Sequence, residues 1–426
     1  MLESDRPGLP NIDEPNTDEP NTDEPGIGPG VSRREFGRGL VGATITTGLF
    51  TGCRPCFSPW PPRTRQPRRA QGPRTFTIRA RIRDGEFRGL RCLLDEPTHN
   101  PFETSANGIH YARLFTTDQQ SLYFMVIYDD YWDAIEFLGK NAAGIDNIFN
   151  RCEDYPPQGA ANADALDAFM RAHLVCVELF YRAYDNSQAE VRDALALRDS
   201  FLQFLQDTDG VGEAELRQRY AAFLKDPNLL NHDRDRANDV DGGASKQAIR
   251  LSPNSPDRVN PFTLLCRVHE QALPKLRRTL ELGTFATIDL GMRPLKNLPT
   301  LHFARVSIVN RNQMLFASVY DGDFIQYVED FGTRIAKEID TVFGACVGYP
   351  LAGSRDILQF KDFLRAHQIV TSAFGGSYLS RSLLQIKSSL ALTQQLARFS
   401  RRVGPDHRRL PDRLRRFLHD NQDLLT

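Results

Sequence analysis

Two patterns of apolar and polar residues alternate along most of this chain. Strand-type runs, in which apolar side chains recur at every second position or in short blocks, occupy Phe76–Arg83, His110–Thr117 and Leu122–Tyr128. Helical spacing, with apolar residues three or four positions apart, occupies Asp84–Asp95 and Trp132–Phe149. The polar residues between the second and third runs predict a β-hairpin. A Tyr-Pro break, a short helix ending at Arg-Ala-His and a last strand complete the predicted order.

The same order of elements occurs a second time. Strand-type runs lie at Phe262–His269, His302–Val309 and Met314–Tyr320, and helical spacing lies at Glu270–Glu281 and Phe324–Phe343. Identical residues align in four blocks, which pair Phe76–Leu94 with Phe262–Leu280, His110–Asp129 with His302–Asp321, Ile145–Pro156 with Ile339–Pro350, and Phe169–Tyr184 with Phe363–Tyr378. Because the gaps fall between elements, the chain contains one supersecondary unit in two copies.

The element order β-α-β-β-α-β, with one extra helix, predicts a ferredoxin-like unit, in which helices cover one face of four antiparallel strands. The other face must also be covered, and a second copy can cover it by packing sheet against sheet. We therefore predict an α+β protein with two tandem ferredoxin-like modules packed sheet to sheet, plus extra helices. The predicted segments are an acidic Pro-rich tail (1–31), a signal (32–53), a basic Pro-rich linker (54–74), the first module (75–207), a linker with one helix (208–260), the second module (261–400) and a C-terminal helical tail (401–426).

This duplicated arrangement resembles the dimeric α/β-barrel superfamily, which includes dye-decolorising peroxidases, chlorite dismutases and small monooxygenases. The resemblance covers about residues 75–400 and implies a small ligand, with haem or a haem-related cofactor as one expectation. The chain contains no G-x-x-D-G string of the peroxidases. The resemblance therefore assigns no distal aspartate.

Composition narrows the classes of function. Apolar residues make up 40% and charged residues 25% of the 426 residues, which is enough for packed cores. The net charge of -1 argues against a protein that binds nucleic acid by neutralising phosphates. Neither a Ser/His/Asp order nor a phosphate loop, a Cys/His cluster or an H-E-x-x-H motif is present, so the sequence predicts no metal site. Five cysteines beyond residue 56 are expected to pack singly as small apolar side chains: Cys92, Cys152, Cys176, Cys266 and Cys346.

The N-terminal region predicts export. The string Ser32-Arg33-Arg34-Glu35-Phe36 is followed by a short apolar stretch that ends in small residues, the order of a secretion signal. It resembles the bacterial twin-arginine signal, which implies the twin-arginine export machinery as a partner. The alternative is a chance Arg-Arg pair before a short amphipathic helix. Export places the protein in the periplasm or on the outer face of the membrane.

A lipid anchor is a further expectation. Leu49–Cys53 resembles a lipobox, in which Cys53 carries the lipid, although Phe50 stands where Leu is usual. Cleavage and release is the competing outcome. The arginines between residues 54 and 69 would favour an anionic membrane surface in either case.

The polar residues that the two copies share are the candidate site residues. They are the pairs His110/His302, Arg113/Arg305, Tyr128/Tyr320, Asp129/Asp321, Arg171/Arg365 and His173/His367. In a hairpin that closes near residue 119, His110 should lie beside Tyr128 and Asp129, within about 3 Å of one of them. His302 should do the same with Tyr320 and Asp321. A histidine beside an aspartate or tyrosine can be a general base, and His173 and His367 are candidate cofactor ligands.

Each candidate also has a structural interpretation. Asp129 and Asp321 precede predicted helices, where an aspartate can cap the free N–H groups. His110 and His302 can then be partners of these aspartates. Arg171 and His173 lie near a helix C-terminus, where cations are favoured. In tandem modules one copy usually keeps the chemistry, so a polar set kept in both copies favours the structural interpretation.

Three functions remain open from the sequence. The first is an exported cell-envelope protein that binds a small ligand or a haem-related cofactor. The second is a non-catalytic envelope interaction module, suggested by the acidic tail and basic tether. The third is an oxidoreductase that acts on peroxide.

Overall fold

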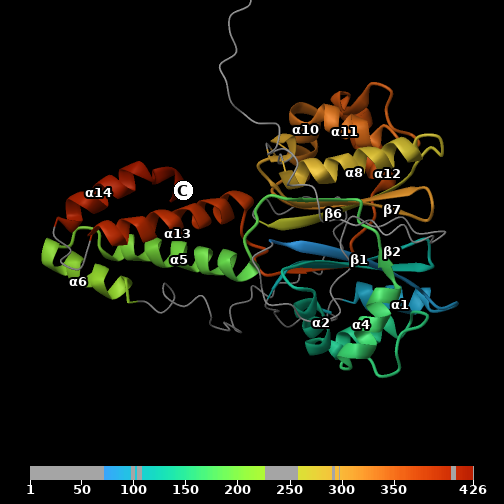
Figure 1. The fold of residues 1–426 in the computed structure, drawn as a ribbon, viewed down its shortest axis with the longest axis horizontal. Helices are drawn as coiled ribbons and strands as arrows, with labels where there is room; N and C mark the ends of the chain where they lie inside the picture. Colours follow the sequence, from blue (N-terminus) through green and yellow to red (C-terminus); the bar gives the residue numbers. More distant parts are fainter. Residues whose placement is uncertain are drawn as a thin grey trace, which may run out of the picture. The chain divides into compact units, whose positions relative to one another are not determined.

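The predicted α+β fold with two ferredoxin-like units is confirmed in a computed structural model (Figure 1). The structure describes residues 72–96, 101–102, 108–225, 258–289, 293–296, 298–403 and 409–425, all within the compact unit Pro55–Thr426. The predicted signal, with Arg33, Arg34 and Cys53, lies outside the described residues.

The first copy follows the predicted order. Its elements are β1 (Arg74–Arg81), α1 (Phe87–Asp95), β2 (Ile109–Thr117), β3 (Ser121–Tyr128), α2 (Tyr131–Lys140), α3 (Ala142–Phe149), α4 (Ala163–Ala172), β4 (Leu174–Val175) and β5 (Leu179–Arg182). Two longer helices follow, α5 (Gln188–Asp207) and α6 (Glu213–Phe223). The helix expected over Trp132–Phe149 is broken at Asn141, whose backbone leaves the helical region and whose amide donates 2.9 Å to the Phe137 carbonyl.

The second copy repeats this order. Its elements are β6 (Val259–Arg267), α8 (Leu273–Asp289), α9 (Arg293–Lys296), β7 (Leu301–Val309), β8 (Gln313–Asp321), α10 (Phe324–Arg334), α11 (Ala336–Phe343), η1 (Gly353–Arg355), α12 (Ile357–His367) and β9 (Ala373–Gly376). The helices α13 (Leu383–Val403) and α14 (Leu410–Asp420) and the short η2 (Gln422–Leu424) end the chain. The helix expected over Phe324–Phe343 breaks at Ile335.

Each sheet takes its edge strand from the other copy. The strand orders are β4-β1-β3-β2-β9 and β5-β7-β8-β6. In the first sheet, the order β4-β1-β3-β2 is the ferredoxin-like order. However, β9 of the second copy pairs with β2, and β5 of the first copy pairs with β7. The two-residue β4 is all that the last segment of the first copy adds to its own sheet. This exchange of edge strands ties the copies together through backbone hydrogen bonds.

The two hairpins close in the same way. Asp118 and Gln119 both have positive φ angles, of 49° and 59°, and Asn310 and Arg311 have φ angles of 46° and 70°. Two consecutive left-handed residues are the signature of the tight turn that matches strand twist. The turns therefore fix the same register in both hairpins, as the predicted internal repeat requires.

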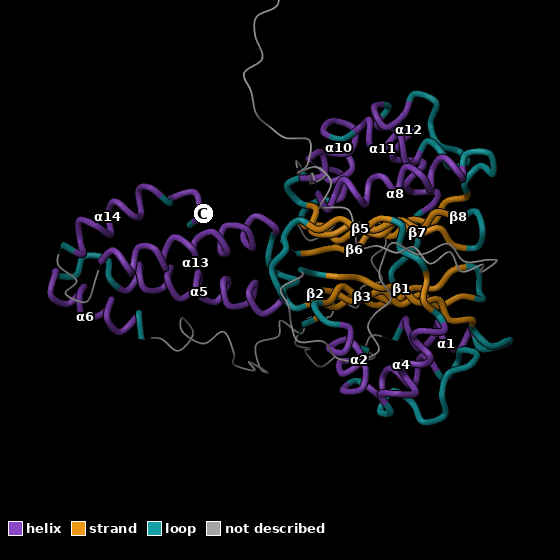
Figure 2. The backbone as a smooth tube through the Cα atoms, viewed as in Figure 1, coloured by secondary structure: helices purple, strands orange, loops and turns teal. Residues whose placement is uncertain are grey.

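The sheets face each other, and helices cover their outer faces (Figure 2). Phe76, Ile78 and Phe124 pack toward α1–α4 in the first copy, and Phe262, Leu264 and Phe316 pack toward the helices of the second. Between the sheets lie two apolar clusters. One contains Tyr111, Ile127, Phe303 and Val319, and the other contains Phe115, Tyr123, Met125, Val309 and Leu315. The inter-sheet layer is thus a second packed core.

Helices α5, α6, α13 and α14, here called the helical arm, have a core of their own (Figure 1). The parallel helices α5 and α13 are its centre, and Phe201, Leu392 and Phe399 are buried there. Both helices begin with a capping box, formed by Ser187 with Glu190 and by Ser382 with Gln385. The duplication therefore extends into the arm. Among the described helices none is long and apolar enough to cross a membrane.

Candidate functional site

Both candidate histidines lie at bulges in their strands. The pairing register shifts on either side of His110 in β2 and on either side of His302 in β7. A bulge re-aims the side chain of its extra residue. Both histidines point into the inter-sheet layer, where both are fully buried and the ring of His110 lies 5.7 Å from that of Phe303 in the opposite sheet.

The predicted contact between each histidine and its aspartate is confirmed. Nε2 of His110 lies 2.9 Å from Oδ1 of Asp129, and Nε2 of His302 lies 2.9 Å from Oδ1 of Asp321. A carboxylate only accepts hydrogen bonds, so Nε2 of each ring carries the proton that is donated. Nδ1 of each ring is therefore the atom that can accept a hydrogen bond within the inter-sheet layer.

The aspartates are not the caps of the helices that follow them, contrary to the sequence-based interpretation. Asp130 caps α2 and Asp323 caps α10, because these helices begin one and two residues later than that interpretation required. Asp129 Oδ2 instead accepts 2.8 Å from the backbone N–H of Gln188, the first residue of α5. The equivalent Asp321 accepts 3.2 Å from the first residue of α13. The aspartates thus join the histidines to the base of the helical arm.

Three buried tyrosines complete a hydrogen-bonded network between the two histidines. The Tyr378 hydroxyl makes a short contact with Nδ1 of His110, and the Tyr184 hydroxyl lies 3.1 Å from that of Tyr378. The Tyr111 hydroxyl lies 3.4 Å from Nδ1 of His302. Burial raises the pKa of Tyr111, Tyr184 and Tyr378 well above the ordinary value, so all three phenols stay protonated.

Tyr128 and Tyr320 do not belong to this network, although the sequence placed them beside the histidines. They pair in register with the strand starts, but their side chains lie on the helix-covered faces. Tyr128 packs against Tyr131 of α2, and Tyr320 stacks on Tyr327 of α10 at 4.1 Å between ring centroids. Successive residues of a strand point to opposite faces, so the residue before the aspartate points away from it.

The two candidate arginines hold the sheets together. Arg113 of β2 donates to the carbonyls of Phe262 and Ser318, at 3.0 and 2.6 Å, and to the Thr263 hydroxyl. Arg305 of β7 makes the equivalent bonds to the Phe76 carbonyl and the Thr77 hydroxyl in the first copy. Its third bond goes instead to the Thr75 hydroxyl, which itself donates to the Val126 carbonyl.

Burial lowers the pKa of both guanidinium groups. The charge of Arg113 lowers that of Arg305 further. Because each arginine bonds to backbone carbonyls of the other copy, the pair is a structural link between the two copies.

The second pair of candidate histidines lies at helix ends. His173 Nδ1 lies 2.8 Å from the Phe169 carbonyl, and His367 Nδ1 lies 2.8 Å from the Phe363 carbonyl. Each imidazole donates its Nδ1–H to the last turn of its helix and packs on the phenylalanine ring, at 4.3 and 4.5 Å between centroids.

The neighbouring arginines bind acidic residues of the same helices, Arg171 to Asp167 and Arg365 to Asp362. Both arginines lie in the last turns of their helices, as predicted.

Sequence reasoning missed the three tyrosines of the network. Tyr184 and Tyr378 occupy equivalent positions, so their identity in both copies was a usable signal. Tyr111 gave no such signal, because its equivalent is Phe303.

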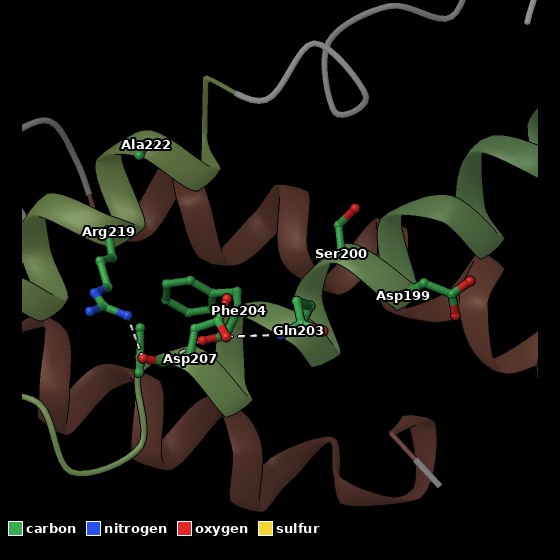
Figure 3. A pocket seen from close by; sticks show the side chains of 8 residues that line it. Asp199, Ser200, Gln203, Phe204, Asp207, Arg219 and Ala222 are labelled. Carbon is green, nitrogen blue, oxygen red and sulfur yellow. Dashed lines mark hydrogen bonds between the residues drawn. The ribbon is translucent and has the colours of Figure 1, made fainter.

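A pocket of about 640 Å³ lies on the helical arm, between α5 and α6 (Figure 3). Polar groups of α5 line one side, including Asp199, Ser200, Gln203 and Asp207, around the ring of Phe204. Arg219 of α6 closes the other side and donates to the Asp207 carbonyl. Gln203 donates 2.8 Å to the Asp207 carboxylate, so the pocket presents groups that both donate and accept.

The buried network has little capacity for catalysis as it stands. A His–Asp pair acts as a general base only where substrate reaches the free ring nitrogen. Here Nδ1 of His110 is occupied by Tyr378, and both rings are fully buried. No group of three or more His, Cys, Asp or Glu side chains among the described residues could hold a metal ion. Among the candidate residues, His173 and His367 use Nδ1 in the hydrogen bonds described above.

Comparison with known proteins adds solved structures of low similarity. No protein-family model matches the chain, and comparison with curated proteins finds no significant match. A protein from Fusobacterium nucleatum, provisionally described as a monooxygenase, is 9% identical with a TM-score of 0.27, over 72% of this chain and 94% of its own. A similarly described protein from Lactobacillus acidophilus is 7% identical, with a TM-score of 0.26 over 72% and 97%.

An anthrone oxidase-like protein is 8% identical, with a TM-score of 0.22 over 74% of this chain and 96% of its own. Likeness at these scores transfers no function.

Proposed function

We propose that this protein is an exported binding protein of the cell envelope, in which the buried polar residues are structural and the helical arm receives the partner. The observation that carries the proposal is the division of polar groups between two places. The candidate residues of the inter-sheet layer bond to one another, to backbone groups and to the base of the arm. The pocket lies instead on the arm, where polar side chains face solvent.

The pocket suits a partner with polar groups. Its volume falls within the range of about 300–1,000 Å³ that ligand sites occupy. Gln203, Asp207 and Arg219 supply both donors and acceptors at its rim, while Phe204 supplies an apolar floor. Such a surface fits a polar segment of another envelope protein. The resemblance to the dimeric α/β-barrel superfamily would then concern the body of the protein rather than its binding surface.

Filling the pocket tests this assignment. Ser200→Trp places an indole in the pocket, and Gln395→Trp makes the same change at the equivalent position of α13. We expect the immobilised protein to retain a component of envelope extracts that the control retains and Ser200→Trp loses. The isolated component should then bind the wild-type protein directly. Equal retention by both variants contradicts the assignment to the arm.

Export is tested separately. Changing Arg33 and Arg34 to Lys should keep the precursor in the cytoplasm, because the paired arginines are the recognised part of the signal. Normal export of this double variant removes the twin-arginine machinery as a partner. Cys53→Ala should move the protein from the membrane to the soluble fraction if Cys53 carries a lipid. An unchanged membrane partition contradicts lipidation.

A haem-related ligand is the second candidate function. It is favoured by the bond from Nδ1 of His173 and His367 to a backbone carbonyl, which leaves Nε2 as the atom with a lone pair. The chemistry of this donor set fits a haem iron at either helix end, and haem would supply redox or peroxide chemistry there. Absorption spectra during haem titration test this candidate. A Soret shift that His173→Ala and His367→Ala both leave unchanged contradicts it.

A further inference from the structure

Two cysteine side chains of the second copy lie against each other, and Cys176 of the first copy is in a disulfide, both contrary to the expectation that the cysteines pack singly. Cys266 lies near the end of β6, and Cys346 follows α11. A β-bridge from Val268 to Cys346 brings the two segments together, and Val347 N–H donates 2.7 Å to the Arg267 carbonyl. The Sγ atoms lie 2.6 Å apart, and both side chains are about 1% exposed.

The first copy provides an internal comparison. The equivalent bridge joins Ile82 to Cys152, so the same two segments meet there. The position of Cys266 is taken by Ala80, and Ala80 and Cys152 are both fully buried. One copy therefore packs with alanine at this place, and the fold itself does not require a pair of thiols.

We infer that Cys266 and Cys346 are a disulfide site, which is oxidised once the protein meets a disulfide-containing oxidant. In the reaction, both thiols lose their protons, the S–S bond of the oxidant breaks, and its two sulfurs leave as thiols. One S–S bond forms between Cys266 and Cys346. The net transfer is two electrons and two protons from the cysteine pair to the oxidant. The inference concerns the second copy alone and does not depend on the partner of the helical arm.

Burial determines when the reaction can occur. The neighbouring Cys346 sulfur and burial raise the pKa of the Cys266 thiol, so the attacking thiolate is scarce in the closed protein. Reaction must therefore use a locally open or partly folded state. Once formed, the bond would be shielded from reductants in solution, and it would close the segment from β6 to the end of α11.

Peptide mapping tests the inference on the full-length protein. Purified protein is exposed to oxidised glutathione, denatured in the presence of an alkylating reagent and digested. We expect a linked Cys266–Cys346 peptide, two hydrogen masses below the sum of its thiol forms, with Cys152 alkylated. Cys152 is a buried thiol and reports that alkylation is complete, whereas the exposed Cys92 can form a mixed disulfide with glutathione. Alkylation of both Cys266 and Cys346 to the extent of Cys152, after oxidation during refolding, overturns the inference.

Two variants separate the disulfide from the fold. Cys266→Ala copies the natural arrangement of the first copy and should fold. Wild-type protein that is refolded with reductant should have a lowered thermal midpoint, and in Cys266→Ala this dependence on reductant should shrink to what the disulfide of Cys176 contributes. Cys152→Ala is the matched control and should keep that dependence. Ala80→Cys should give the first copy a second linked pair with Cys152. Loss of the reductant dependence in Cys152→Ala, and not in Cys266→Ala, contradicts the assignment.

Discussion

The hydroxyl groups of Tyr184 and Tyr378, which occupy equivalent positions in the two copies, lie 3.1 Å apart. Equivalent residues of two similar halves can contact each other only close to the approximate twofold axis that relates the halves. The network is nevertheless unequal on its two sides. Tyr111 contacts His302, whereas its equivalent Phe303 has no hydroxyl to offer His110, and Tyr378 takes that place.

The two histidines are expected to contribute unequally to stability. His110→Ala should cost about 1 to 3 kcal/mol, because buried groups of Asp129 and Tyr378 lose a partner. His302→Ala should cost less within that range, because its contact with Tyr111 is already long at 3.4 Å. Chemical unfolding measures both values, with the exposed His419→Ala as control. A cost near zero for His110→Ala, together with loss of ligand uptake, would instead favour a binding role.

Removal of single hydroxyls tests the network. Tyr378→Phe leaves Nδ1 of His110 without its donor and should cost about 1 to 2 kcal/mol. Tyr184→Phe should cost less, because the Tyr378 hydroxyl keeps its bond to His110. Thermal unfolding of the two variants gives the comparison. The reverse ranking would contradict a dominant contribution from the bond between Tyr378 and His110.

Replacement of the two arginines should have non-additive costs. Arg113→Met should cost about 1 to 3 kcal/mol, because buried acceptors of the opposite sheet lose their donor. Arg305→Met should behave alike. The double variant should cost more than the sum of the single costs, because each single replacement also relieves the repulsion between the two charges, and the double variant gains that relief only once. A double-mutant cycle by urea unfolding measures the coupling, with the exposed Arg88→Met as a neutral control, and strict additivity would contradict it.

Glu178 should make stability depend on pH. Burial raises the pKa of its carboxyl to about 7, from an ordinary 4.5. Between these values the folded protein binds more protons at this residue than the unfolded chain does, so stability falls as pH rises from 4.5 to 7.

Glu178→Gln can keep the acceptor for the Ile308 N–H and lose the charge. It should therefore be more stable than wild type at pH 8, by on the order of 1 to 2 kcal/mol, with little difference at pH 4. Unfolding midpoints across this range measure the effect. Parallel curves for the two proteins would show that Glu178 is not the titrating group.

The sequence predicted most of the fold because the repeat supplied its own comparison. Strand-type runs, turn residues and the hairpin register followed from periodicity, and the contact of His110 with Asp129 followed from that register. The exchange of β5 and β9 could not be predicted, because a strand of four residues reads the same whichever sheet it joins. Only the packing of complete sheets decides between the two partners.

The candidate site was predicted only in part, because several of its contacts depend on a strand bulge or on residues that are remote in sequence. Strict alternation would have placed His110 on the opposite face from Tyr111, and the bulge that re-aims it has no signature in the residue pattern. The partner of Asp129 at Gln188 is also remote in sequence, so helix capping by the nearest helix was the natural but wrong interpretation. The roles of Arg113 and Arg305 depend on the opposite sheet, which local sequence does not describe.

The exchanged edge strands have a consequence for how the chain can change over generations. In a pair of identical subunits, each substitution appears on both sides of the axis and must be tolerated twice. Here the two copies have separate sequences within a single chain, and the exchanged strands β5 and β9 hold them together. A residue can therefore be changed in one copy only. Phe303 is the equivalent of Tyr111, and Ala80 is the equivalent of Cys266. Because the two copies lie in one chain, equivalent positions of a nearly symmetric fold can carry different residues.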